Sequence, residues 1–386
     1  MNAKSTVGVK MKVSILTQPL GHNYGGLLQA YALQLYLKSI GCDVETLDRR
    51  APEMSGTIVK NYLINLVRLA LGRIKYLPTA RKYNHIYRNL SDFRDGNIMM
   101  SRKITSDEQL REYYRQHAFD VVLVGSDQVW RSKYSPNLYN YYLDFLDDIN
   151  SNAKRVSYAA SFGVSKWEYT DETTRACKLL ISKFSAVSVR ERSAIDLCQA
   201  HFDITPEWVV DPTMLLKADD YEKLLPPENF SGHEGQILSY VLDPTNDKQQ
   251  ISKKVSNILG KKVFSVKPDK NLTQVQRSEL DQCQYPKVET WLQGFKDAHF
   301  VVTDSFHGCV FAILFNKPFL AVGNPTRGLA RFNSLLSLFN LYDRLIYTAE
   351  ELSRSIIEAS LDWGQVNSIR EEKAKAGKAF LQRNIF

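Results

Sequence analysis

Short apolar runs alternate with stretches of helical periodicity along most of the chain. In the first half, the runs that fit buried strands lie at residues 13–16, 44–47, 121–124, 156–159 and 186–189. The pattern also predicts helices over 27–40, 171–182 and 191–201. Strand–helix alternation of this kind is typical of a parallel, doubly wound α/β sheet.

A second series of the same kind begins near residue 206. Its expected strands lie at 237–242, 263–266, 300–302 and 319–322, and its expected helices at about 246–259, 288–297, 306–316 and 327–339. The chain has 386 residues, more than one ordinary hydrophobic core accommodates. We therefore expect a first α/β domain over 1–205, a second over 206–364 and a charged terminal helix over 365–386.

The third strand of this second series leads into the most informative stretch of the sequence. His307 and Gly308 stand where the strand near 300–302 gives way to an apolar helix. In open α/β sheets, ligands bind at the carboxyl ends of the strands, and a helix start offers unpaired N–H groups to an anion. Asp304 and Ser305 fit the same anion site, or they only cap the helix. A titratable imidazole at this position favours a functional role for His307.

Two turns of the first half also follow strands directly. Asn23, Tyr24, Gly25 and Gly26 precede the helix over 27–40, and paired glycines let a ligand approach the backbone, although a plain tight turn is the alternative.

The second of these turns follows the strand at 121–124. Ser126 and Asp127 come first and are candidates for a cleft by their position after a strand. Trp130 comes next, either to stack on a sugar ring or to fill the core.

Arg190 ends the strand at 186–189 and begins the next helix. A guanidinium there suits a carboxylate or phosphate, which it can hold with two parallel hydrogen bonds. The alternative is an internal pair with Glu191 or Asp211. No Ser-His-Asp spacing, P-loop, HExxH or EF-hand sequence is present. Since no other cluster of metal ligands is evident in the sequence, no metal site is expected.

The net charge of +8 is concentrated in a basic segment over 68–103, within a helical insertion expected at about 56–118. Only Asp92 and Asp95 oppose its nine cations, which are Arg68, Arg73, Lys75, Arg81, Lys82, Arg88, Arg94, Arg102 and Lys103. Apolar residues interleave with them, so the segment can lie on an anionic membrane, meet a phosphorylated partner or form a solvated helical face. No nucleic-acid motif accompanies the charge, so nucleic acid is not an expected partner.

The location of the protein is suggested by what the sequence does not contain. No apolar run reaches the roughly 18 residues of a membrane span, and the first ten residues lack the apolar core of an export signal. The five cysteines are scattered and form no CxxC pair, which fits a reducing compartment. We expect a cytoplasmic protein, peripheral at the inner face of the membrane if 68–103 binds lipid.

Taken together, six motifs in one order resemble the polysaccharide pyruvyl transferase family over roughly residues 12–325. They are Asn23–Gly26 with Leu28–Ala32, Gly125–Trp130, Ser157–Ala160, Ser188–Glu191, Asp211–Thr213 and Thr303–Gly308. The resemblance implies a fold like the GT-B glycosyltransferases, with two Rossmann-like domains facing a cleft. It implies transfer of a pyruvyl group from phosphoenolpyruvate to two sugar hydroxyls, giving a cyclic ketal. The acceptor would be a surface polysaccharide such as a capsule or exopolysaccharide, or its lipid-linked precursor, and no cofactor beyond the co-substrate phosphoenolpyruvate is implied.

The resemblance also assigns roles to residues. Arg190 and His307 match the family's donor-site arginine and histidine, with Asp304, Ser305 and Gly308 beside the donor. The first domain then takes the acceptor, in the cleft formed by Asn23, Tyr24, Gly25, Gly26, Ser126, Asp127 and Trp130. Some members have an arginine where this chain has Ser305, a cation that Lys267, Arg327 or Arg331 could replace. The competing interpretations are a glycosyltransferase with a nucleotide-sugar donor and an inactive carbohydrate-binding protein.

Overall fold

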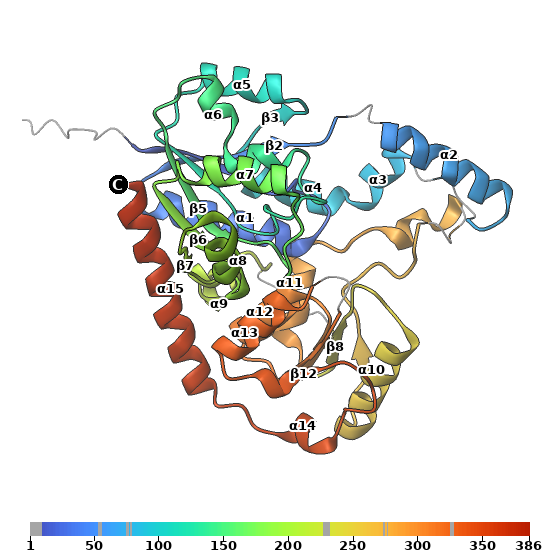
Figure 1. Ribbon diagram of the computed structural model, residues 1–386. Coiled ribbons are helices and arrows are strands. Elements are labelled where there is room, and N and C mark those ends of the chain that lie inside the picture. The colour runs from blue at the N-terminus through green and yellow to red at the C-terminus, as the bar shows by residue number, and fades with distance from the viewer. Residues whose placement is uncertain are drawn as a thin grey trace, which may run out of the picture.

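Seven parallel strands form the first sheet within the part of the chain that the structure describes. The computed structural model describes residues 10–52, 56–74, 77, 79–226, 232–272, 275, 277–324 and 328–386 (Figure 1). The strand order of this sheet is β3-β2-β1-β4-β5-β6-β7. The strands are β1 (Lys12–Leu16), β2 (Asp43–Arg49), β3 (Met100–Ile104), β4 (Val121–Val124), β5 (Lys154–Ala160), β6 (Ala186–Val189) and β7 (Glu207–Trp208).

Helices lie between these strands in the chain. They are α1 (Tyr24–Ser39), α2 (Gly56–Ala70), α3 (Ala80–Ile86), α4 (Arg88–Asn97), α5 (Asp107–Gln116), α6 (Phe145–Asp148), α7 (Asp171–Ile181) and α8 (Ser193–Phe202). Among them, α2 stands well away from the sheet (Figure 1). The central strands are largely buried, and β4 has four consecutive buried apolar residues. Such runs fit strands of a parallel sheet that is covered on both faces.

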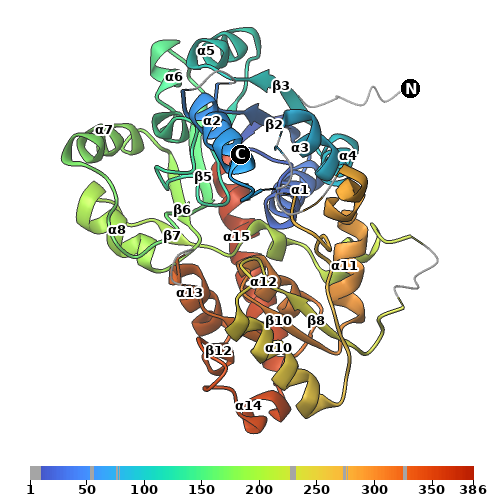
Figure 2. The same cartoon turned by 90° about the vertical axis from the view of Figure 1, so that its right-hand side faces the viewer.

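The second sheet has five parallel strands among the described residues, in the order β12-β11-β10-β8-β9. The strands are β8 (Ile237–Tyr240), β9 (Val263–Phe264), β10 (Phe300–Thr303), β11 (Phe319–Val322) and β12 (Leu345–Ile346). The accompanying helices are α9 (Ala218–Glu222), α10 (Asn246–Leu259), α11 (Val288–Asp297), α12 (Phe306–Leu314), α13 (Ala330–Leu338) and α14 (Arg354–Glu358). The chain thus forms two Rossmann-like units, which lie one above the other in Figure 2.

Two sequence expectations about organisation are wrong in detail. The segment 56–118, expected as a helical insertion, contains β3, which pairs with β2 at the edge of the first sheet. The first sheet also continues past residue 205, the expected end of the first domain, because β7 pairs with β6. Both strands are short edge strands, and neither carries the apolar run by which the central strands were recognised.

The terminal helix α15 (Trp363–Ile385) leaves the second unit and returns to the first (Figure 1). Its last turns bury Phe380, Leu381 and Ile385 in the same cluster as Val13 of β1 and Tyr158 of β5. None of the described helices has the length and apolar character needed to cross a bilayer.

Candidate active site

A cavity of about 170 Å³ lies where the carboxyl ends of the two sheets meet. The first unit contributes loops that follow β1 and β4, and the second contributes the loops after β8 and β10 together with the start of α13. The lining residues are Asn23, Gly25, Asp127, Gln128, Tyr240, Leu242, Asp304, Ser305, Phe306, His307, Arg331 and Phe332. Parallel sheets place ligands at this edge, so the cavity is the candidate site.

His307 lies in the first turn of α12 and faces the start of α1. Ser305 is the N-cap of α12, and its Oγ accepts a hydrogen bond of 3.3 Å from the N–H of Gly308. The imidazole packs directly on Gly25, where a Cβ atom would lie 2.1 Å from His307 Nδ1. The position of the histidine therefore depends on a glycine from the other unit.

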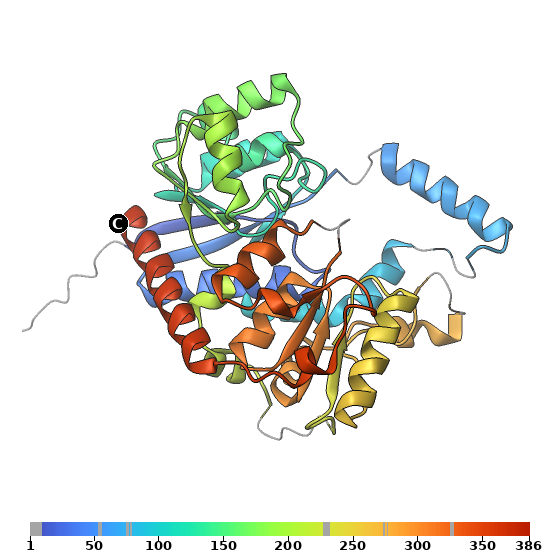
Figure 3. The ribbon, with the colours of Figure 1, turned by 60° about the horizontal axis from the view of Figure 1, so that its bottom comes forward.

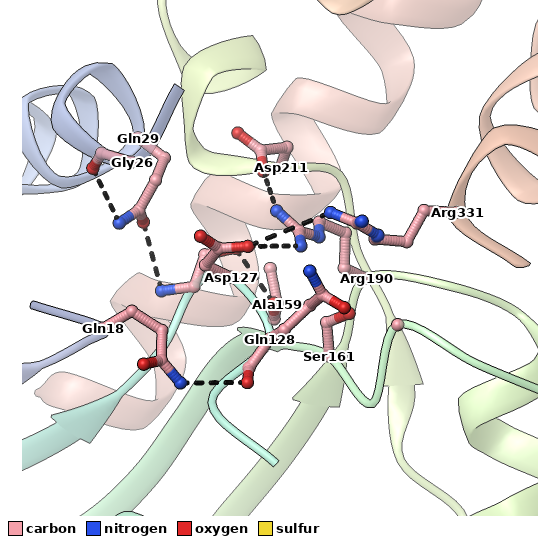
Figure 4. A network of polar contacts seen from close by, with 12 residues as sticks. Gln18, Gly26, Gln29, Asp127, Gln128, Ala159, Ser161, Arg190, Asp211 and Arg331 are labelled. Atoms are coloured by element: carbon pink, nitrogen blue, oxygen red, sulfur yellow. Dashed lines mark hydrogen bonds and ion pairs between the residues drawn. The ribbon is translucent and has the colours of Figure 1, made fainter. Parts of the chain in front are cut away.

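Arg190 forms two ion pairs inside this contact between the units. Its guanidinium donates from NH1 to Asp211 Oδ2 at 2.7 Å and from NH2 to Asp127 Oδ1 at 3.1 Å (Figure 4). The same Asp211 oxygen lies 3.5 Å from His307 Nε2. Asp127, Arg190, Asp211 and His307 thus form one network. The side chains of Arg190 and Asp211 at its centre are each about 1% exposed.

The network fixes the charges of its carboxylates. Burial alone raises the pKa of Asp211, but His307 and Arg190 hold that pKa well below its usual value. The pKa of Asp127 is likewise lowered, because Arg190, Arg331 and His307 outweigh the effect of its burial. The same carboxylates keep the pKa of Arg190 raised despite its burial. Both aspartates are therefore ionised at neutral pH.

Arg331 brings a second guanidinium to the cavity from α13. Its NH1 lies 3.9 Å from Asp127 Oδ1, and Figure 4 shows it reaching toward Arg190 from the second unit. Both guanidinium groups lie over the ring of Phe306, Arg190 at 4.8 Å and Arg331 at 5.5 Å from the ring centre. Burial, followed by repulsion from Arg190, lowers the pKa of Arg331 to about 10. An anion beside Arg331 would relieve this repulsion.

The other residues predicted beside the donor shape the loop after β10. Asp304 borders the cavity, but its carboxylate accepts hydrogen bonds from the backbone of Leu242 and Asp243 and from Lys248 Nζ at 2.7 Å. Gly308 lies against β10, where a Cβ atom would be 2.2 Å from Thr303 Oγ1. Asp304 and Gly308 therefore stabilise the backbone of this loop. Gly308 has no side chain with which to bind a ligand.

The predicted cleft residues of the first unit divide into lining and supporting groups. Asn23 lines the cavity and caps α1 by accepting from the N–H of Gly26, whose surroundings are filled by the same side chain. Tyr24 is buried between the units, donates to the carbonyl of Pro286 at 2.8 Å and stacks on Trp291.

Ser126 and Asp127 are adjacent in the sequence, but their side chains point in different directions. Ser126 is fully buried and donates to the carbonyl of Ala159 at 3.0 Å, so it supports the loop after β4. Asp127 is the residue of this pair that reaches the cavity.

Trp130 does not stack on a ligand, which corrects one of the two interpretations of this residue. Its side chain is fully buried in the core of the first unit and stacks on Tyr142 at 5.3 Å between ring centres. The indole N–H donates to the carbonyl of Tyr141 at 3.0 Å. A buried tryptophan with a satisfied N–H is a core residue.

Asp211 is the principal site residue that the sequence did not single out. The sequence indicates Asp211 only as a possible internal partner of Arg190, although Asp211–Thr213 is one of the six motifs. Thr213 donates to its Oδ1 from both the backbone N–H and the hydroxyl, which leaves Oδ2 for Arg190 and His307.

Of the three cations suggested to replace the family arginine, Arg331 lies at the cavity and Arg327 lies outside the described residues. Lys267 instead donates to the carbonyls of Val241 and Leu242.

Comparison with known proteins adds a family to this geometry. The family model described as "Polysaccharide pyruvyl transferase" matches residues 23–326, which include every residue of the network except Arg331. The chain belongs to the polysaccharide pyruvyl transferase family. No curated protein matches it.

Solved structures show the fold of this pyruvyl transferase family member to be that of GT-B proteins. Arabidopsis thaliana UGT89C1 complexed with UDP-L-rhamnose has a TM-score of 0.54 at 11% identity, covering 97% of each chain. A glycosyltransferase from Rickettsia africae has a TM-score of 0.52 at 12% identity, covering 98% of this chain and 94% of its own. A putative UDP-N-acetylglucosamine 2-epimerase from Listeria monocytogenes scores 0.52 at 10% identity, covering 95% and 91%. At such identities the likeness concerns the fold alone.

Proposed function

We propose that this protein transfers a pyruvyl group from phosphoenolpyruvate to a pair of sugar hydroxyls, forming a cyclic ketal in the synthesis of a surface polysaccharide. The observation that carries the proposal is a cavity between the units that is lined by His307 and Arg331, with the buried Arg190 paired to the lining residue Asp127. The family match supplies the reaction class. No metal is invoked, and the described residues contain no cluster of three or more His, Cys, Asp or Glu that could hold one.

The donor carries a phosphate and a carboxylate, so its site needs cations that reach the cavity. Arg331 lines the cavity, whereas Arg190 does not line it and is paired with Asp211 and Asp127. We therefore assign the main anion contact to Arg331, in place of the arginine that some members have at the position of Ser305. Arg190 then fixes Asp211 and Asp127 and adds its charge to the site.

The chemistry requires two protons to be removed from the acceptor hydroxyls and two to be delivered, one to the donor methylene and one to the leaving phosphate. Protonation of the donor methylene makes a methyl group and leaves an oxocarbenium-like carbon, which the first acceptor hydroxyl attacks as it loses its proton. The bond from that carbon to the phosphate oxygen then breaks, phosphate leaves, and the second hydroxyl closes the ring and loses its proton. His307 is the group proposed to carry protons, because imidazole exchanges them near neutral pH and Asp211 orients the ring.

Calorimetric titration of the protein with phosphoenolpyruvate tests the donor. We expect binding of phosphoenolpyruvate, with UDP- and GDP-sugars as controls that bind far more weakly. Release of inorganic phosphate in the presence of a panel of soluble and lipid-linked glycans then identifies the acceptor. His307→Gln should retain the donor affinity within a few fold and lose at least about a hundredfold in turnover.

The opposite results would favour the competing interpretations. Tight binding of a nucleotide sugar, with none of phosphoenolpyruvate, would replace pyruvyl transfer by glycosyl transfer. Glycan binding without turnover of either donor would indicate a carbohydrate-binding protein. The structural likeness to proteins that use UDP-sugars does not favour the first of these outcomes, because it extends only to the fold.

A further inference from the structure

Helix α2 projects from the first unit and makes its apolar side chains accessible to solvent. Figures 1 and 3 show it standing away from both sheets, beyond α3. Its described side chains, together with the residue that follows the helix, include six large exposed hydrophobic groups. They are Tyr62 (47% exposed), Leu63 (56%), Ile64 (38%), Leu66 (39%), Val67 (57%) and Leu71 (62%). So large a group of exposed apolar side chains on one element is a typical interaction surface.

The charge around this helix has one sign. Residues 56–91 contain no aspartate or glutamate, and their seven cations are Lys60, Arg68, Arg73, Lys75, Arg81, Lys82 and Arg88. Of these, Arg68, Arg73, Arg81 and Arg88 are exposed in the structure. A surface that combines apolar side chains with exposed arginines is complementary to an anionic lipid bilayer.

The structure also separates this surface from the rest of the basic segment. Leu90 and Phe93 of α4 are buried in the core, and Arg102 of β3 lies over the ring of Tyr113. We therefore centre the membrane surface on α2 and the residues that follow it up to Arg88, and a contact through all of 68–103 stays a prediction.

We propose that α2 lies in the headgroup region of an anionic membrane, with its apolar side chains inserted and the neighbouring arginines on the phosphates. Its 15 residues span about 22 Å, less than the roughly 30 Å of a bilayer core, so it lies along the surface rather than crossing it. A second copy of the chain is a poorer occupant, because a symmetric contact would bring two sets of these cations together.

The segment that follows α2 is attached to the molecule close to the cleft. Tyr87, between α3 and α4, contacts His22 at the start of α1 and stacks on Tyr285 of the second unit, each at 4.8 Å between ring centres. Tyr24, next to the cavity residue Gly25, is 6.1 Å from the same Tyr285 ring. This part of the inference rests on the proposed function: the acceptor sugar would be lipid-linked and delivered to the cleft from the membrane.

A fluorescent label on α2 gives a direct test. All five native cysteines are buried, so Val67→Cys can be labelled selectively with an environment-sensitive dye. Leu179→Cys on α7 is the matched control, since Leu179 is 69% exposed but lies on a different element. With vesicles of equal phosphatidylglycerol and phosphatidylcholine, the label at 67 should shift to the blue and the label at 179 should not. Pure phosphatidylcholine vesicles should give little shift.

Two further variants separate the apolar and charged contributions. Arg68→Gln with Arg73→Gln should lower partitioning into the anionic vesicles about thirtyfold, at about tenfold per 1.4 kcal/mol and roughly 1 kcal/mol per cation. Leu63→Ser with Val67→Ser should lower it by a comparable factor. Equal partitioning of these variants and the parent would overturn the proposal, as would a blue shift that appears without vesicles as the protein concentration rises, which indicates a second copy.

Turnover distinguishes this inference from the proposed function. With a soluble acceptor, the α2 variants should release phosphate from phosphoenolpyruvate at the parent rate. If neither parent nor variants use phosphoenolpyruvate while the label at 67 still reports anionic vesicles, the donor assignment fails and the membrane contact stands.

Discussion

Replacing Gly25 by alanine should disable the site while leaving the fold intact. The added Cβ would lie 2.1 Å from His307 Nδ1 and 2.4 Å from its Cγ, whereas ordinary contact begins at 3.4 Å. The imidazole and the start of α1 must therefore separate by about 1.3 Å. A displacement of about 1 Å at a reacting group can lower a rate a hundredfold, so we expect at least that loss in turnover.

The effect of Gly25→Ala on stability should be small, because two contributions oppose each other. Alanine favours a helix over glycine by about 1 kcal/mol, and overpacking costs about 1–3 kcal/mol. The assay is phosphate release from phosphoenolpyruvate with an active acceptor, measured beside thermal unfolding. Gly96→Ala is the matched control: Gly96 is also helical, but a Cβ there meets nothing within 4 Å, so activity should be unchanged. Turnover of Gly25→Ala within threefold of the parent would refute the role given to the His307 contact.

Three further changes test the network and its surroundings. Arg331→Gln should weaken phosphoenolpyruvate binding about tenfold to a hundredfold by calorimetry, with part of the affinity retained in Arg331→Lys; an unchanged affinity would remove this contact. The folded pKa values of Asp211 and Asp127 lie below their ordinary 3.8, so the stability they contribute is present above about pH 4 and is lost as the pH falls. The melting temperature of the parent should therefore drop more steeply as the pH falls below about 4 than that of Asp211→Asn, and parallel curves would contradict the assignment. Trp130→Phe should lower the melting temperature but leave the affinities for donor and glycan unchanged, because this indole only fills the core.

The periodicity of the chain predicted both sheets because their central strands are buried on both faces. Several of these strands are apolar runs, as in 121–124, and recognisable helices follow the strands at 13–16, 156–159 and 186–189. The edge strands β3 and β7 carry no such run. Arg102 and Lys103 of β3 are exposed, so this strand is defined by its backbone pairing with β2 rather than by its side chains.

Residues of the candidate site could be predicted where they come directly after a strand. That rule identified Asp127, Arg190 and His307, which the fold brings together from three different loops. It gave no information about which neighbouring side chain turns inward. Ser126 and Trp130 follow the same strand as Asp127, yet both are fully buried in the first unit.

Arg331 could be proposed only through the resemblance, because it lies one turn inside the span expected for a helix rather than at a strand end. Its proximity to Asp127 depends on how the two units pack, and no periodicity within either unit contains that information. Long-range contacts of this kind are the part of the site that local sequence does not specify.

The return of α15 to the first sheet has a consequence for how the protein is made. The face of that sheet formed by Val13 and Tyr158 is covered by Phe380, Leu381 and Ile385, which are synthesised after both sheets. The amino-terminal unit therefore keeps an uncovered apolar face until α15 has been made. A premature stop before α15, although it would leave both sheets and the whole network of the cleft encoded, yields a nascent chain with a permanently exposed surface of the kind that chaperones and proteases recognise.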